Sequence, residues 1–506
     1  MIPVPGFEGR RIAVFGLGRS GLTAARALKA GGALPVLWDD SVSSRLQAEA
    51  EGFAVEDLTV ADWSGFAALV LSPGAPLTHP EPHWTVGKAK AAGVEVIGDI
   101  ELFARAIAAL PEAERPRVVA ITGTNGKSTT TALLGWVLKQ AGLTVHVGGN
   151  IGIGVLALPA PTPGAVYVIE VSSYQLDLTT SFAPDVAILT NVSPDHLERH
   201  GDMEGYVAAK ARIFRAQGAD GLALVGVDER WGQGIARDLA ENGRRVTTVS
   251  TLPSPLGGEG VSRSETDEGF AGHAQAGAGE AAQAPSSEPL RGPPSPPRGE
   301  GILAADGALT IAGQPTIDLS RARSLPGRHN AQNAAFAWAA ARVLGVSHAA
   351  AVEGLVTFPG LAHRMEHVAT LGRVRFINDS KATNADAARQ ALASYERSFW
   401  IAGGRAKAGG IDDLEDLFPR VVEAFLIGEA AGPFAARLGE TPHRISSDMA
   451  GAVRAAAEAA AATGRDEVVL LSPAAASFDQ YPDFEARGEA FRAAVLALGA
   501  VPASAA

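Results

Sequence analysis

The chain has 506 residues, 46% of them hydrophobic, which is enough for about three domains of roughly 150 residues each. Its formal net charge of −12 argues against a surface built mainly to bind nucleic acid. It has no cysteine, which excludes disulfides, cysteine-ligated zinc and thiol nucleophiles. No leader peptide is recognisable, and no apolar run reaches the roughly 18 residues of a membrane span. We therefore expect a cytoplasmic protein without membrane insertion, and a monomer as the starting expectation.

The first predicted domain, residues 1–112, has four apolar segments that each end in a glycine, proline or acidic turn. These predicted strands cover residues 11–15, 34–38, 67–71 and 94–97. The first is followed by a Gly-x-Gly-x-x-Gly turn, Gly16–Gly21, and by an alanine- and leucine-rich helix, Leu22–Ala30. The second strand is followed directly by Asp39, at the position where a dinucleotide-binding fold has its ribose-binding acid. The pattern favours a nucleotide-diphosphate site, and a dehydrogenase stays open because this turn alone is weakly specific.

The second predicted domain, residues 113–359, contains the most specific motif of the chain. A buried strand, Val118–Ile121, precedes the sequence Thr-Gly-Thr-Asn-Gly-Lys-Ser and an apolar-periodic helix. The two glycines let backbone N–H groups face a phosphate, Lys127 neutralises phosphate oxygens, and Ser128 or Thr129 can ligate Mg²⁺. The strand ends in isoleucine where a strict Walker A motif has glycine, so the loop is a shorter variant. This motif predicts a nucleoside triphosphate site.

Three further predicted strands of this domain end in polar residues. They cover residues 145–147, 165–169 and 186–190. Their alternation with helical segments such as residues 203–216 predicts a doubly wound α/β sheet. Glu170 follows the second of these strands, one strand away from the phosphate loop, and is placed to hold Mg²⁺ against a γ-phosphate. His196, after the third strand, and Lys210, on the helix, have no role from pattern alone, since such residues are more often structural or solvated.

The composition changes abruptly between about residues 250 and 301, where Pro, Gly, Ser, Glu and Ala dominate. Such a segment buries too little apolar surface to offset its chain entropy. We expect a disordered surface insertion, with a protein-docking segment as the alternative. Beyond it, a short hairpin is predicted over residues 302–317, and Leu325–Asn330 opens an alanine-rich helix.

The third predicted domain, residues 360–506, repeats the alternation of strands and helices. Its predicted strands cover residues 374–377, 398–401 and 467–471, and the loops after them carry Asp379, Lys381, Thr383, Arg405, Lys407 and Ser477. Hydroxyls and cations at one sheet edge suit a small amine that bears a carboxylate. The predicted fold class is therefore α/β with three domains, each on a mainly parallel sheet. The N-terminal domain is expected to be Rossmann-like, the central one P-loop ATPase-like and the C-terminal one Rossmann-like.

Taken together, these motifs resemble the Mur ligase family. The matching pieces occur in order outside the insertion, at residues 122–129, 148–152, 170–176, 191–196, 325–333, 363–364, 378–384 and 470–479. The resemblance implies an ATP-dependent amide ligase of peptidoglycan precursor synthesis, in which the three domains bind a UDP substrate, ATP and an amino acid respectively. Within the family it is closest to the branch that joins D-glutamate to UDP-N-acetylmuramoyl-L-alanine with ATP and Mg²⁺.

The resemblance also implies roles for individual residues. The implied catalytic residues are Lys127, Lys210, Glu170 and His196, with Lys210 carbamylated to give a carboxylate analogue. The implied metal ligands are Ser128, Glu170, His196 and the carbamylated Lys210. The implied ATP-binding residues are Gly123, Thr124, Asn125, Gly126, Lys127, Ser128, Thr129, Asn330, Asn333, Arg364 and Asp379. The implied UDP-substrate residues are Gly18, Arg19, Ser20, Asp39, Gly74 and Asn150. The implied D-glutamate residues are Lys381, Thr383, Lys407, Ser477 and Phe484.

The alternatives to this interpretation are a dehydrogenase, a non-enzymatic scaffold and a sister ligase of either of two kinds. A dehydrogenase built on the first glycine turn leaves the second phosphate loop unexplained, and a non-enzymatic nucleotide-binding scaffold would release no ADP. A sister ligase that adds a diamino acid is expected to carry an Asp-Asn-Pro-Arg-like loop, which the chain lacks. A folate-polyglutamylating relative is expected to have glycine at the position of Ser128. The identity of the amino acid therefore rests on the resemblance and not on spacing.

Overall fold

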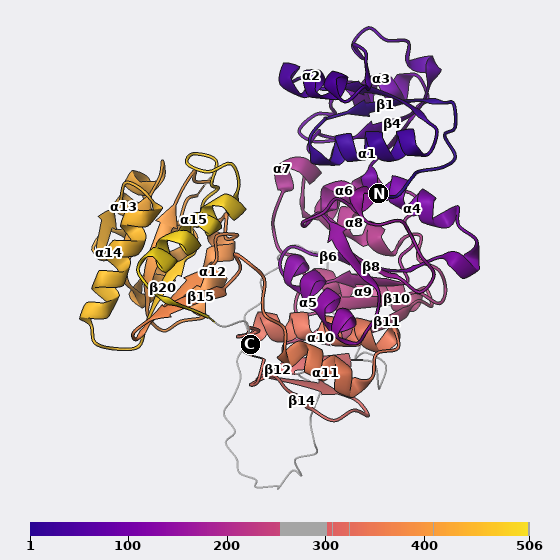
Figure 1. Ribbon diagram of the computed structural model, residues 1–506. Helices are drawn as coiled ribbons and strands as arrows, with labels where there is room; N and C mark the ends of the chain where they lie inside the picture. The colour runs from indigo at the N-terminus through magenta and orange to yellow at the C-terminus, as the bar shows by residue number, and fades with distance from the viewer. Residues whose placement is uncertain (253–300, 306, 323, 408, 504–506) are drawn as a thin grey trace, which may run out of the picture.

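The computed structural model describes residues 1–252, 301–305, 307–322, 324–407 and 409–503, without the side chain of Arg19. The expectation of a disordered insertion concerns mainly residues 253–300, which lie outside the described residues. The described chain forms three sheets in succession. In the ribbon diagram the N-terminal domain is indigo, the central domain runs from magenta to red-orange, and the C-terminal domain from orange to yellow (Figure 1). The predicted α/β fold class with three mainly parallel sheets is confirmed.

The N-terminal sheet is wholly parallel and has the order β3-β2-β1-β4-β5. Its strands are β1 (Arg11–Phe15), β2 (Leu34–Trp38), β3 (Ala54–Val55), β4 (Phe66–Leu71) and β5 (Glu95–Ile97). The accompanying helices are α1 (Arg19–Ala30), α2 (Val42–Ala50), α3 (Trp84–Ala91) and α4 (Asp99–Ala108). Buried alanines and leucines of α1 pack against β1 in the core, as expected for a strand, turn and helix unit.

The central sheet has the order β14-β13-β12-β11-β10-β9-β6-β8-β7. Its strands are β6 (Arg117–Thr122), β7 (Val145–Gly149), β8 (Val166–Glu170), β9 (Val186–Leu189), β10 (Leu222–Gly226), β11 (Arg245–Ser250), β12 (Gly301–Ala305), β13 (Ala308–Ile311) and β14 (Ile317–Asp318). The predicted hairpin is confirmed as β12 and β13, and β12 also extends the parallel part of the sheet by pairing with β11. The edge strands β13 and β14 are antiparallel.

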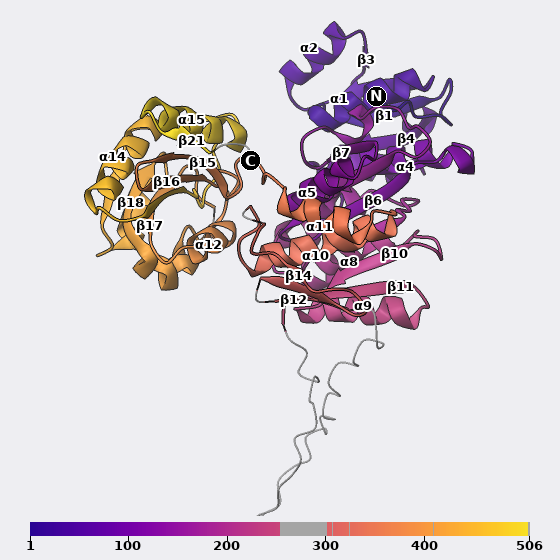
Figure 2. The same cartoon turned by 60° about the horizontal axis from the view of Figure 1, so that its bottom comes forward.

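Helices cover both faces of the central sheet. They are α5 (Lys127–Gln140), α6 (Ser173–Asp177), α7 (Leu197–His200), α8 (Met203–Ala211), α9 (Arg230–Glu241), α10 (Arg328–Val343) and α11 (His348–Val356). The second view shows α10 and α11 beside α5 (Figure 2), and their buried alanines and leucines form one core with the sheet. The helix predicted over residues 203–216 ends at Ala211 and continues as a 3-10 turn, Arg212–Phe214.

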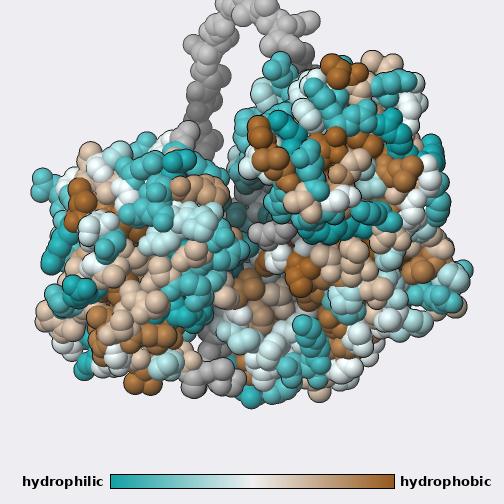
Figure 3. Space-filling model, turned by 45° about the horizontal axis from the view of Figure 1, so that its top comes forward, coloured by the Kyte–Doolittle hydropathy of each residue, from teal (hydrophilic) through white to brown (hydrophobic). Residues whose placement is uncertain are grey.

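The C-terminal sheet has the order β19-β18-β17-β20-β16-β15-β21, with β15 and β21 antiparallel at one edge. Its strands are β15 (Glu366–Leu371), β16 (Val374–Asn378), β17 (Ser398–Gly403), β18 (Val421–Ile427), β19 (His443–Ile445), β20 (Glu467–Leu471) and β21 (Val501–Pro502). Its helices are α12 (Ala385–Ala393), α13 (Ala431–Leu438), α14 (Met449–Ala462) and α15 (Phe484–Ala497). In the space-filling view a hollow separates this domain from the other two (Figure 3).

The N-terminal and central domains share a continuous core through α4. The rings of Phe103 on α4 and Tyr167 on β8 lie 5.6 Å apart, and both side chains are fully buried. The buried carboxylate of Glu101 accepts hydrogen bonds from the backbone N–H groups of Thr180 and Ser181 at 2.8 and 2.9 Å. This contact ties the first domain to the central one. The described residues contain no helix that is long and apolar enough to cross a membrane.

Candidate functional site

The phosphate loop lies at the carboxyl edge of the central sheet, between the ends of two neighbouring strands. Strand β6 pairs with β8 on one side, where Ile121 is opposite Glu170, and with β9 on the other, where Thr122 is opposite Leu189. The expected position of Glu170, one strand away from the phosphate loop, is therefore confirmed. Because these strands are parallel, the loops that follow them open at the same edge.

Two glycines of the loop have no room for a side chain. Gly126, which precedes α5, has a left-handed backbone with φ of +81°, and a Cβ there would lie 2.4 Å from Oδ1 of Asn333. At Gly123 a Cβ would lie 1.9 Å from Oγ1 of Thr190. These distances are far below contact distance, so any larger residue would displace the loop.

Side chains that follow β9 hold the loop in place. Asn191 accepts a hydrogen bond from the backbone N–H of Asn125 at 2.8 Å and donates one to its carbonyl at 3.1 Å. Thr190 donates to the same carbonyl at 2.6 Å. Motif reasoning did not assign a role to Thr190 or to Asn191, although both stand at the end of a predicted strand at this edge. Their position was the signal that could have identified them.

Two lysines, the buried Lys210 and the half-buried Lys127, converge on one carbonyl of the loop. Lys127 Nζ donates to the carbonyl oxygens of Gly123 and Thr124 at 2.9 and 2.7 Å, and Lys210 Nζ donates to that of Gly123 at 2.7 Å. Burial lowers the pKa of Lys127. Burial lowers the pKa of Lys210 well below its usual value, and the charge of Lys127 lowers it further. Lys210 is thus suited to exist as a neutral amine, which is the form that reacts with electrophiles.

Glu170 has a buried carboxylate that is only half satisfied. Its Oε1 accepts a hydrogen bond from Nδ2 of Asn150 at 2.9 Å, and the whole residue is 2% exposed. Its Oε2 is buried and has no hydrogen-bond partner among the described residues. The negative charge of Glu170 raises the pKa of both Lys127 and Lys210 against the effect of burial, which places it close to them. A buried oxygen without a partner is costly, so the arrangement fits a cation ligand.

His196 stands where α7 begins, with a left-handed backbone at φ of +54°. Its Nε2 lies 3.3 Å from a carboxylate oxygen of Asp195, and its ring packs 4.9 Å from that of Tyr174. Burial is the largest effect on its pKa and lowers it, which favours the neutral imidazole that binds metals. No group of three or more His, Cys, Asp or Glu side chains in the described part of the chain could hold a metal alone. A metal here would also need donors such as Ser128 or a modified Lys210.

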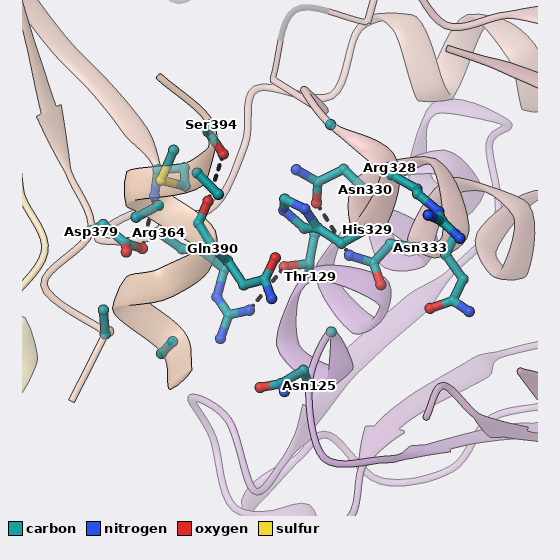
Figure 4. Close-up of a pocket in the computed structure, with 18 of the residues that line it drawn as sticks. Asn125, Thr129, Arg328, His329, Asn330, Asn333, Arg364, Asp379, Gln390 and Ser394 are labelled. Carbon is teal, nitrogen blue, oxygen red and sulfur yellow. Dashed lines mark hydrogen bonds between the residues drawn. The ribbon is translucent and has the colours of Figure 1, made fainter. Parts of the chain in front are cut away.

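A cavity of about 560 Å³ lies between the central and C-terminal domains. It is lined by seven of the residues implied for ATP, namely Asn125, Gly126, Thr129, Asn330, Asn333, Arg364 and Asp379. The close-up shows Asn330 and Asn333 on one wall and Arg364 with Asp379 on the opposite wall (Figure 4). Gly123, Thr124, Lys127 and Ser128 are not among its lining residues. Residues that motif reasoning missed also line it: Asp228, Glu229, Thr251, Arg328, His329, Gln390 and Ser394.

Three hydrogen bonds join the C-terminal domain to the phosphate loop and α5. Lys381 Nζ donates to Oγ of Ser128 at 2.9 Å. Arg364 Nη1 donates to Oγ1 of Thr129 at 3.4 Å, and Asn125 Nδ2 donates to a carboxylate oxygen of Asp386 at 3.0 Å. Lys381, implied for D-glutamate, therefore contacts the phosphate loop. Burial and the charge of Arg364 lower the pKa of Lys381 to about 8.

The remaining residues implied for D-glutamate lie on three loops of the C-terminal domain. Thr383 precedes α12, Lys407 is exposed, and Ser477 is buried. Phe484 begins α15, and its ring centroid lies 5.2 Å from Nζ of Lys381. The charge of Lys407 contributes to the lowered pKa of His196, so this loop faces the central domain.

The residues implied for the UDP substrate fall in two places. Gly18, Ser20, Asp39 and Gly74 follow strands β1, β2 and β4 at one edge of the N-terminal sheet, with Arg19 at the start of α1. Asp39 accepts hydrogen bonds from the backbone N–H groups of Leu17 and Ser41 at 2.6 and 2.8 Å, which shapes the glycine turn. Asn150 lies apart from them, in the central domain beside Glu170.

Asp379 predicts a measurable pH dependence of stability. Burial raises the pKa of its carboxyl to about 7 in the folded protein. The neutral Asp379 carboxyl makes its full contribution to folding stability below the usual carboxyl pKa. This contribution is lost as pH rises, because Asp379 ionises at lower pH in the unfolded chain than in the folded protein, where it ionises only near pH 7. We expect the melting temperature of the wild type to fall relative to Asp379→Asn between about pH 4 and 7 and then to level. Asp466→Asn, an exposed position, is the control, and parallel curves for Asp379→Asn would contradict the prediction.

Comparison with known proteins gives consistent matches along the chain. The family model described as "Mur ligase middle domain" matches residues 121–272, and that described as "Mur ligase, glutamate ligase domain" matches residues 363–475. The chain is 57% identical over 506 residues to the "UDP-N-acetylmuramoylalanine--D-glutamate ligase" of Caulobacter vibrioides, covering 99% of this chain and 98% of that one. It is 56% identical to the protein of the same name from Phenylobacterium zucineum, covering 98% of each.

Solved structures share the fold. The UDP-N-acetylmuramate-alanine ligase MurC of Thermotoga maritima matches with a TM-score of 0.54 at 16% identity, covering 97% of this chain and 99% of that one. The MurF ligase of Thermotoga maritima, solved in complex with ADP, matches with a TM-score of 0.51 at 16% identity, covering 97% of this chain and 96% of that one. These structures show the shared fold, and the identity to the curated relatives along almost the whole length shows the family. The chain belongs to the Mur ligase family.

Proposed function

We propose that this protein is an ATP-dependent ligase that joins D-glutamate to UDP-N-acetylmuramoyl-L-alanine, in cytoplasmic synthesis of peptidoglycan precursors. The observation that carries the proposal is the 57% identity, over 99% of the chain, to ligases named for this reaction. The site supports it independently, because Lys127, Lys210 and Glu170 gather at the phosphate loop beside a cavity of nucleotide size.

The reaction proceeds through an acyl phosphate. The carboxylate of the UDP substrate attacks the γ-phosphorus of ATP and ADP leaves; the amine of D-glutamate then attacks the acyl carbon, loses a proton and displaces phosphate. Lys127 neutralises charge on the phosphate oxygens in the transition state. The contacts of Lys381 and Arg364 with α5 bring the C-terminal domain over the phosphate loop, which excludes water that would hydrolyse the acyl phosphate.

We assign Mg²⁺ binding to Ser128, Glu170, His196 and Lys210. The fit rests on the buried Oε2 of Glu170, which lacks a partner among the described residues, and on the lowered pKa of His196. A hydroxyl, a carboxylate and a carbamate supply the oxygen donors that Mg²⁺ prefers. When bound, Mg²⁺ supplies charge neutralisation at the phosphates.

Lys210 fits the proposed carbamylation. Burial and the charge of Lys127 lower the pKa of Lys210 well below its usual value, which favours the neutral amine. The neutral amine attacks the carbon of CO₂, an N–C bond forms, and one amine proton is lost to solvent. The product is a carbamate anion beside Lys127, whose positive charge stabilises it.

The other proposed assignments follow the domains. The boundaries 1–112, 113–359 and 360–506 fall between the three sheets, and we assign UDP-substrate, ATP and amino-acid binding to them in that order. The residues proposed for each ligand are those implied above, and the contact of Lys381 with Ser128 supports a further role for Lys381 at the phosphates. We also propose that the protein acts as a monomer.

Phosphate release with UDP-N-acetylmuramoyl-L-alanine, ATP and a panel of amino acids tests the function. We expect release with D-glutamate and little with L-glutamate, L-alanine, L-lysine or meso-diaminopimelate, because a site built to pair a particular carboxylate arrangement rejects ligands that leave its polar groups unpaired. The formed amide is identified by mass spectrometry. Preferential coupling of another amino acid would overturn the D-glutamate assignment, and absence of ADP release with every acceptor would overturn the ligase assignment.

A further inference from the structure

The short helix α7 lies between the N-terminal domain and the central sheet (Figure 1). Arg199 on α7 donates three hydrogen bonds to the loop that follows β4: to the carbonyl oxygen of Gly74 at 3.0 Å, and to those of Pro73 and Ala75 at 3.1 Å each. Gly201, at the end of α7, also abuts this loop, since a Cβ there would lie 2.9 Å from Nε2 of His79. The single turn of α7 therefore contacts and positions the loop after β4 in the N-terminal domain.

Arg199 is connected to the proposed metal ligand through the ring of Tyr174. Its guanidinium carbon lies 4.4 Å from the ring centroid of Tyr174, and that ring lies 4.9 Å from the ring of His196. His200, one residue after Arg199, is fixed in turn, with Nε2 3.0 Å from Oγ of Ser173 and Nδ1 3.3 Å from a carboxylate oxygen of Asp177. The helix that carries both Arg199 and His196 is thus anchored to α6.

The charged side chain of Arg199 contacts only neutral groups at this domain boundary, among the described residues. It forms no ion pair with a carboxylate in the described part of the chain, and its N–H groups go to carbonyl oxygens while its face stacks on Tyr174. A planar fork with several donors and a stacking face is specific to arginine, and lysine cannot reproduce it.

The hydrogen bonds from Arg199 also fix the direction of the backbone N–H of Gly74. Across a trans peptide the C=O and N–H point in opposite directions, so binding of the Pro73 carbonyl turns the Gly74 N–H away from Arg199. The next N–H, that of Ala75, is used within the loop by the carbonyl of Ser72 at 3.0 Å. Gly74 is therefore presented with its N–H available to a ligand, at a position proposed for the UDP substrate.

We propose that Arg199 is a positioning residue that couples the UDP-substrate loop, Pro73–Ala75, to the metal-ligand turn at His196. This rests on the proposed function of those two segments. Arg199 touches neither the reacting atoms nor the nucleotide cavity; it acts by fixing the loop through three carbonyls and the turn through Tyr174. The UDP substrate bound by the N-terminal domain and the metal bound by the central domain are then held in a fixed position relative to each other.

Arg199→Ala and Arg199→Lys, compared with wild type, test the coupling. We expect about a tenfold or larger rise in KM for UDP-N-acetylmuramoyl-L-alanine and a rise in the Mg²⁺ concentration for half-maximal rate, since supporting residues of this kind typically cost that much. KM for ATP and the melting temperature stay close to wild type. Arg237→Ala, on the exposed face of α9, is the matched control and leaves all four values unchanged. A KM for the UDP substrate within twofold of wild type, or an equal change in every KM together with a lower melting temperature, would overturn the proposal.

Hydrogen exchange separates this inference from the proposed function. In the free protein, Arg199→Ala should speed exchange in the peptide that contains residues 72–77, whatever the enzyme's substrate. Unchanged exchange there overturns the coupling. Faster exchange in a protein whose wild type does not use the UDP substrate overturns only the proposed function.

Discussion

Lys127→Ala should abolish ATP-dependent amide formation while leaving the fold intact. The substitution removes an ammonium group held within the phosphate loop, and loss of one such charge at a phosphoryl-transfer site costs at least about a hundredfold in kcat. The fold should persist because the lysine bonds only to carbonyls of its own loop, at Gly123 and Thr124. The measurement is ADP release at saturating substrates, with the melting temperature taken in parallel.

Lys139→Ala is the matched control for this experiment. It removes a lysine from the exposed last turn of the same helix, α5, so it has the same composition change without the phosphate contact. Its turnover should equal that of the wild type. If Lys127→Ala retained near-normal turnover while folding normally, the phosphate site would not be where the loop places it.

Lys210 carries the second large expected effect. Lys210→Arg places a fixed positive charge at this position and cannot form a carbamate, because the guanidinium stays protonated at every accessible pH. We expect a loss of at least about a hundredfold in kcat for this variant, as for an essential metal-site residue. The wild type should lose activity in CO₂-depleted buffer and recover it with added bicarbonate, and the variant should respond to neither.

The recovery of activity with bicarbonate should depend on pH in a predictable direction. The lowered pKa of Lys210 keeps its amine neutral at lower pH than an ordinary lysine, so recovery with bicarbonate should extend to lower pH than it would for an unshifted lysine. An unshifted lysine would recover well only in alkaline buffer. A ¹³C NMR carbamate signal from wild type in ¹³C-bicarbonate checks the modification directly, even if the arginine variant folds poorly. Activity that is indifferent to CO₂, with no such signal, would contradict carbamylation.

Regular apolar segments were predictable because local pattern determines them. The strands predicted over residues 11–15, 34–38 and 467–471 have the same bounds in the structure. Other elements gave no clear pattern. Strand β11, Arg245–Ser250, contains three polar hydroxyl residues, and β19 and β21 span only three and two residues. Such elements are strands because their neighbours pair with them, which is a tertiary effect.

The site was predictable at its motifs and not at its contacts between domains. A glycine-rich loop after a strand has one common use, so the phosphate loop could be located from its residues. The contacts of Lys381 with Ser128 and of Arg364 with Thr129 join residues 253 and 235 positions apart, and no local pattern reports such distances. The same holds for Arg199, whose partners in the first domain are 124 to 126 positions away.

The packing of Asn333 against Gly126 has a consequence for how the cavity responds when the C-terminal domain moves. Thr130 on α5 donates a hydrogen bond to Asn333 at 3.1 Å, and Asn333 donates to Asn330 at 3.2 Å, so the phosphate loop and the cavity wall formed by α10 are joined within the central domain. The other wall, with Arg364 and Asp379, belongs to the C-terminal domain. Separation of the two domains would therefore leave one half of the cavity assembled and carry the other half away.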